Sequence, residues 1–185
     1  MRNRLDSQDK VKKTNTKTHK LLDEVNNLAD LINQVLDQRK KDQYFESIAL
    51  LHSFIEDMLK WLVFIQIVWN KSEKGVMPNG EWEQIRQYCN QLSFHQLLNL
   101  GLSVDLLSFS LFYRLDKIRI ERNQLVHQYW LHTHKSKLHV MRKKLEKLAG
   151  IANTLVRKLN DLVKQTGMDE SYELLDIKEG KNLIP

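Results

Sequence analysis

Apolar residues recur at alternating steps of three and four along most of this chain, the spacing that lines one face of an α-helix. The pattern predicts a first helix over residues 15–38 and a second over residues 42–70. The inner face of the first helix is expected to carry Leu21, Val25, Leu28, Ile32 and Val35. The inner face of the second is expected to carry Tyr44, Ile48, Leu51, Ile55, Met58, Leu62 and Ile65.

Turn-forming residues divide the rest of the chain. The stretch NKSEKGVMPNG, residues 70–80, combines glycine, proline and asparagine and predicts a loop. Short helices are predicted over residues 81–91 and 94–100, the second ending at Gly101. Ser103 is then expected to cap a long helix that reaches about residue 130. Its first turns are apolar on nearly every side, so neighbouring helices or another chain should cover them.

The last predicted helix, residues 136–166, has the most regular pattern and ends before Gly167. Its inner face is expected to carry Leu138, Met141, Leu145, Leu148, Ala152, Leu155, Leu159 and Leu162. Together the segments predict an all-α fold, an antiparallel up-and-down bundle of about five helices over residues 15–167. Residues 1–14 are expected to be flexible, and residues 168–185 are interpreted as an acidic tail.

Composition agrees with this fold and limits the setting in which the chain works. Its 185 residues suit one domain, and its two prolines and six glycines favour helices over sheets. The single cysteine, Cys89, excludes an internal disulfide framework, and the polar N-terminus does not resemble a secretory signal. The most apolar stretch, residues 58–69, is shorter than the roughly 20 residues that a bilayer span needs. We therefore expect a cytoplasmic protein that does not enter membranes.

The stretch ERNQLVHQYW, residues 121–130, places a charge within the apolar face of the long helix. Arg122 lies about 40° around the helix from Ile118, where a charge is costly unless it meets an anion or a hydrogen-bonding partner. His127 follows five residues later, about 140° around a continuous helix. The two can share a site only if the helix bends, if the arginine folds across its own helix, or if a second copy of the chain completes the site.

The octet RNQLVHQY resembles the R-x-x-x-x-H-x-Y motif, with asparagine after the arginine, of the HEPN domains, which are helical ribonucleases and RNA-binding modules. The stretches YFESIALLHSFIEDMLKWL and LLSFSLFYRLDKIRIERNQLVHQYW are similar to the helices of such domains, so the resemblance covers residues 42–130. It implies a homodimer with a composite Arg–His site. The His-x-Tyr ending is similar to toxins paired with a nucleotidyltransferase antitoxin, which becomes a candidate partner.

Metal-independent RNA cleavage requires residue types that this motif supplies. In that reaction the 2′-OH attacks the neighbouring phosphorus, which needs a proton-exchanging group and a fixed cation. His127 suits the first role and Arg122 the second, with Asn123 and Tyr129 in support. The sequence thus predicts an endoribonuclease of the toxin or defence type that needs no cofactor. The net charge of +6 and the isoelectric point near 9.3 agree with RNA as a partner.

The basic stretch HKSKLHVMRKKLEK, residues 134–147, could follow an RNA backbone through Lys135, Arg142, Lys143 and Lys144. Basic helix faces are also commonly just solvated. The nearby histidines His132, His134 and His139 predict no metal site, because no cysteine or carboxylate joins them at a suitable spacing.

Two other interpretations of the motif stay open. The same fold could bind RNA, a nucleotide or a partner nucleotidyltransferase without cleaving anything. Alternatively, the motif could be accidental in a structural bundle. Arg122 would then form a buried ion pair with Glu56 or Asp57, and His127 would be a core histidine with satisfied hydrogen bonds.

Overall fold

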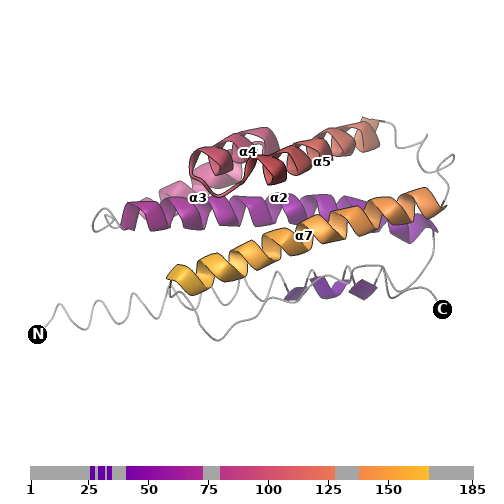
Figure 1. Cartoon of the computed structure of the whole chain (residues 1–185), viewed down its shortest axis with the longest axis horizontal. Helices are drawn as coiled ribbons and strands as arrows, with labels where there is room; N and C mark the ends of the chain where they lie inside the picture. Colours follow the sequence, from indigo (N-terminus) through magenta and orange to yellow (C-terminus); the bar gives the residue numbers. More distant parts are fainter. Residues whose placement is uncertain are drawn as a thin grey trace, which may run out of the picture.

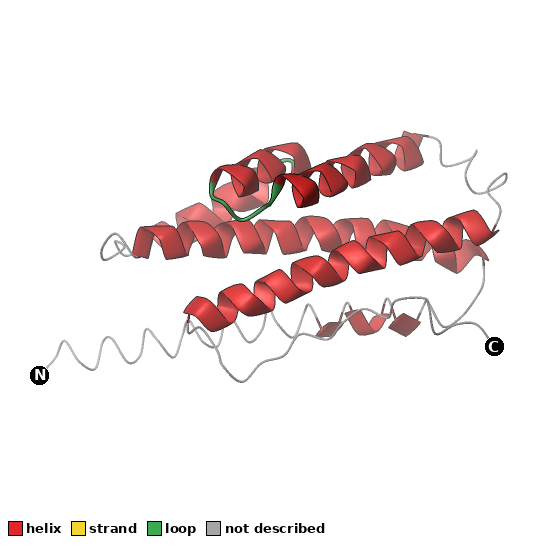
Figure 2. Ribbon diagram, in the orientation of Figure 1, coloured by secondary structure: helices red, strands yellow, loops and turns green. Residues whose placement is uncertain are grey.

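The computed structural model describes residues 26–27, 29–31, 33–34, 41–72, 80–127 and 138–166. Residues of the first predicted helix that fall in this set are helical, and five longer helices follow. These are α2 (Lys41–Ser72), α3 (Glu81–Gln91), α4 (Phe94–Ser103), α5 (Phe109–His127) and α7 (Leu138–Thr166). The described part of the chain contains no strand, as Figure 2 shows. The predicted all-α class is therefore confirmed.

Helix α2 lies at the centre of the molecule and contacts every other long helix. Its most extensive contact is with α7, which runs beside it in the same direction, while α3, α4 and α5 cover its other side (Figure 1). Helix α5 runs opposite to both α2 and α7. Chain direction thus alternates from α2 to α5 to α7, as expected for an up-and-down course, but the principal pair of helices is parallel.

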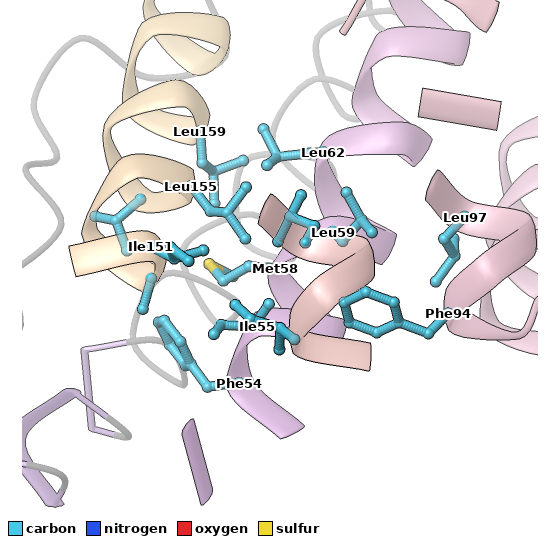
Figure 3. Packing of buried hydrophobic residues seen from close by; sticks show 14 of the residues in the cluster. Phe54, Ile55, Met58, Leu59, Leu62, Phe94, Leu97, Ile151, Leu155 and Leu159 are labelled. Atoms are coloured by element: carbon cyan, nitrogen blue, oxygen red, sulfur yellow. The ribbon is translucent and has the colours of Figure 1, made fainter. Parts of the chain in front are cut away.

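The core forms where α2 meets α7 on one side and α4 on the other. Met58 lies between α2 and α7 among apolar side chains of both helices (Figure 3). The predicted inner face of α2 is buried throughout, as is that of α7 from Met141 onward. Buried apolar area of this kind is the main source of folding free energy. The inner face predicted for the first helix lies outside the described residues, as do residues 1–14 and 168–185.

The connection between α4 and α5 differs from the prediction. Helix α3 has the predicted bounds, but α4 continues through Gly101 to Ser103, and Ser103 donates to the Leu100 carbonyl instead of capping a new helix. Asp105 then adopts a left-handed conformation with φ of 58°, which aspartate tolerates better than most residues. Helix α5 starts only at Phe109.

A close approach explains this turn. The Leu106 and Leu107 amides both donate to the Gly101 carbonyl at 3.0 Å, so the chain folds back over the last turn of α4. A Cβ atom on Gly101 would lie 2.9 Å from the Leu107 side chain, which explains why glycine stands inside the helix. Ser108 replaces Ser103 as the capping residue, since its hydroxyl accepts from the Leu111 amide at 3.3 Å.

One face of the first turns of α5 is exposed in this chain, where the sequence predicted cover by neighbouring helices or by another chain. Phe109 and Tyr113 are 79% and 73% exposed, and Ile120 on the same face is 44% exposed. Only the opposite face of α5, with Leu111, Leu115 and Ile118, is buried against the rest of the chain. Within the described residues, no helix is long and apolar enough to cross a membrane.

The packing of α7 against α2 predicts that truncating a buried side chain lowers the free energy of unfolding more than truncating an exposed one. Replacing the fully buried Leu155 by alanine should lower the free energy of unfolding by about 2–5 kcal/mol, because the contacts and the burial of the side chain are both lost. Val140→Ala on the same helix is the control, since Val140 is half exposed and should change the value by less than about 0.5 kcal/mol. Urea unfolding followed by circular dichroism measures both. Equal costs would contradict the described packing.

Candidate functional site

Arg122 lies near the end of α5 and is bound to α2. Its guanidinium Nη1 donates to the Glu56 carboxylate, and the same carboxylate lies 3.4 Å from the Lys60 ammonium one turn further along α2. The Arg122 side chain remains 38% exposed, whereas that of Glu56 is only 18% exposed. Glu56 therefore fixes a guanidinium that stays accessible on its outer side. The ion pair with Glu56 is also the contact expected if the arginine has a structural role.

A second ion pair ties the same turn of α5 to α7. The Lys147 ammonium donates to the Glu121 carboxylate at 3.0 Å. Adjacent residues of α5 thus reach different helices, Arg122 toward α2 and Glu121 toward α7. The end of α5 is thus connected by ion pairs to α2 on one side and to α7 on the other.

His52 is buried at this junction and was not predicted from the sequence. It lies on α2 one turn before Glu56, is 2% exposed, and neither ring nitrogen has a hydrogen-bonding partner among the described residues. Burial, together with the positive charges of Arg122 and Lys144, lowers the pKa of His52 to about 4, against a smaller opposing effect of Glu121. The imidazole is therefore neutral at pH 7.

Leaving a buried polar group without a partner costs about 1–3 kcal/mol, so a histidine here calls for an explanation beyond packing. The sequence contained a usable signal. His52 stands in the apolar run IALLHSFI, residues 48–55, directly after a residue of the predicted inner face, where a leucine would have served the core better. What the sequence could not reveal is which charges α5 and α7 bring to it.

The structure describes only some of the other residues of the motif. Helix α5 is continuous through His127, so the helix does not break between Arg122 and His127. Arg122 reaches across to α2 and does not fold back along its own helix. Asn123 is exposed, the side chain of His127 lies outside the described part, and so does Tyr129. Arg122 and the backbone position of His127 thus start from different sides of one helix, about 140° apart.

Of the four residues predicted to bind RNA, the three that the structure describes have different surroundings. Arg142 is paired with Glu146 at 3.0 Å, Lys143 is exposed, and Lys135 lies outside the described residues. Lys144 is partly buried and acts electrostatically on His52, so it belongs to the junction with Arg122. Lys144 makes no ion pair with any residue that the structure describes.

Two other kinds of chemistry find no support in the described residues. Within them, no group of three or more histidine, cysteine, aspartate or glutamate side chains could hold a metal ion, while His132 and His134 lie outside. Cys89 is buried, and burial raises the pKa of its thiol to about 11, so it is protonated at neutral pH and a poor nucleophile.

Comparisons of this chain with protein-family models, with curated proteins and with solved structures found no match.

The buried histidine predicts a loss of stability in acid. Because the pKa is about 4 in the folded chain and near 6.5 in the unfolded chain, the stabilisation is complete above pH 6.5 and decreases as the pH falls toward 4. This one group should lower the free energy of unfolding by about 3 kcal/mol between pH 7.5 and pH 4. Urea unfolding at a series of pH values measures the loss.

His52→Gln should make this pH dependence smaller by the same amount, because glutamine does not titrate. His139→Gln is the matched control, since His139 is an exposed histidine of α7 and should leave the wild-type profile unchanged. An unchanged profile in His52→Gln would contradict the assignment of a neutral, buried imidazole.

Proposed function

We propose that this protein is a metal-independent endoribonuclease whose working pair is Arg122 and His127, drawn from two copies of the chain. The observation that carries the proposal is how Arg122 is paired and how much of its side chain is exposed. Its guanidinium is bound by the partly buried Glu56 carboxylate, while the Arg122 side chain stays 38% exposed. A fixed, accessible guanidinium is what stabilises the charge that develops on a phosphate during cleavage.

The exposed face of α5 supports the participation of a second chain. Phe109, Tyr113 and Ile120 share this face, and the backbone position of His127 follows Ile120 by seven residues, which returns to the same side of the helix. Large apolar side chains gathered on one helix face commonly mark an interface. Pairing of two chains along this face would bring the motif's histidine position of each chain to the interface.

The proposed reaction follows from these roles. A 2′-OH of RNA attacks the adjacent phosphorus, and the imidazole of His127 accepts its proton as the new P–O bond forms. The bond to the 5′-oxygen breaks, and this oxygen takes up a proton as it leaves. Arg122 would stabilise the phosphorane oxygens, while Asn123 and Tyr129 would orient the pair or the substrate. The products are a 2′,3′-cyclic phosphate and a 5′-hydroxyl.

The ion pair between Arg122 and Glu56 favours a second candidate, a helical module that binds RNA, a nucleotide or a nucleotidyltransferase without cleavage. In that case the arginine serves mainly to attach α5 to α2. The two functions differ in one respect that can be measured, because only the enzyme needs Arg122 for bond breaking while the fold stays intact.

Purified protein is expected to cleave single-stranded RNA in the presence of EDTA. Arg122→Ala should lower the rate by about 10²–10³-fold, the usual cost of losing a donor that stabilises transition-state charge. His127→Ala should lower it by about 10²–10⁴-fold. The matched control is Arg119→Ala, which removes an arginine of the same helix that is paired with Asp116 at 2.7 Å. Helical circular dichroism checks that each variant is folded.

Equal losses in Arg122→Ala and Arg119→Ala would indicate a general effect of charge and would exclude the proposed role. RNA binding by the wild type without any cleavage would support the non-catalytic module instead.

Mixing the two inactive variants tests whether the site is shared. If each site takes Arg122 from one chain and His127 from the other, heterodimers of Arg122→Ala with His127→Ala contain one intact site. An equimolar mixture that exchanges subunits freely should then regain about a quarter of wild-type activity. A site formed within one chain would regain none.

A further inference from the structure

Side chains from three helices have donors without an acceptor among the described residues at the junction of α2, α5 and α7. His52 of α2 has two unpaired ring nitrogens, and Lys144 of α7 makes no ion pair with any described residue. Arg122 of α5 uses Nη1 for Glu56, which leaves most of its five N–H donors for other acceptors. Arg122 and Lys144 both lie close enough to His52 for their charges to act on it.

The carboxylates nearby do not neutralise this group. Glu56 is shared between Arg122 and Lys60, and Glu121 is paired with Lys147. Among the described residues, the junction therefore keeps two cations beside a neutral imidazole with no acceptor for its N–H. Such an arrangement suits an oxyanion, which brings several acceptor oxygens and negative charge together.

We propose that Arg122 and Lys144, with His52 beneath them, form a binding site for a phosphate group of an RNA backbone. That the phosphate belongs to RNA rests on the proposed function, whereas the phosphate site itself follows from the unpaired donors. Arg122 and Lys144 contact the phosphate oxygens from their solvent-accessible sides. His52 supplies an imidazole N–H at the buried side of the site.

Binding of a phosphate by Arg122 and Lys144 would leave the ion pair that holds α5 in place. The guanidinium can keep Nη1 on Glu56 and direct its other N–H groups to phosphate oxygens, in the bidentate manner common for arginine. Lys144 adds a point charge from α7. Occupation of the site would thus join α5 and α7 more firmly on their exposed side, where Glu121 and Lys147 already connect them.

The test uses a 2′-O-methyl dinucleotide, a phosphodiester that cannot be cleaved because it has no free 2′-OH. Binding is measured by NMR titration of the intact protein, following the imidazole resonance that disappears in His52→Gln. The probe should shift this resonance in a saturable manner. Inorganic phosphate in a parallel titration shows whether a monoester-like anion binds there as well; binding of the diester is what the proposal requires.

Lys144→Ala should weaken binding of the probe by about ten-fold or more, the effect of losing one charge-assisted contact. Lys164→Ala is the matched control. It removes the same charge from an exposed position near the other end of α7 and should change the affinity by less than about two-fold. Equal weakening by the two variants, or a probe that leaves the His52 resonance unmoved, would overturn the proposed site.

These outcomes are separate from those of the cleavage assay. RNA cleavage with equal effects of Lys164→Ala and Lys144→Ala would leave the proposed enzyme standing and remove the phosphate site. Specific binding of the probe without cleavage of natural RNA would leave the phosphate site standing and remove the proposed enzyme.

Discussion

Burial of α2 on two sides is the constraint on which the rest of this structure depends. Because α7 covers one side and α3, α4 and α5 the other, few positions of α2 can carry polar groups without a partner. Each polar side chain that does occur there must be paired or must be neutral. Glu56 meets the first condition through Arg122 and Lys60, and His52 meets the second because its pKa is lowered.

This constraint gives Arg122 a twofold character. The guanidinium pairs with a partly buried carboxylate of α2, so it contributes to the docking of α5. It also remains more exposed than its partner, so the same group can meet a ligand. Structural and functional roles are therefore not exclusive at this position. A group whose orientation is already fixed by a protein carboxylate loses less entropy when it binds a phosphate than a free side chain does.

Much of the fold could be predicted from spacing alone, since the inner faces of α2 and α7 repeat regularly and are buried as expected. The α4–α5 turn could not, because its left-handed Asp105 depends on the approach of Leu107 to Gly101, a tertiary contact. For the site, the sequence singled out Arg122 and, in the structural interpretation, offered Glu56 or Asp57 as its partner; the structure pairs it with Glu56. It missed His52, whose significance arises only when α5 and α7 bring their cations to it.

The two faces of α5 serve different purposes. Its inner face, with Leu111, Leu115 and Ile118, leads along the helix to Arg122 and the charged junction. Its outer face carries Phe109 and Tyr113, which are largely exposed in this chain. Large apolar side chains gathered on one helix face commonly mark an interface. Such a helix, with one face in its own bundle and exposed aromatic side chains on the other, is suited to pairing with the same helix of a second chain. A two-fold axis places the two identical faces against each other. A turn of about 140° separates Arg122, which faces the bundle, from the backbone position of His127 on the outer face.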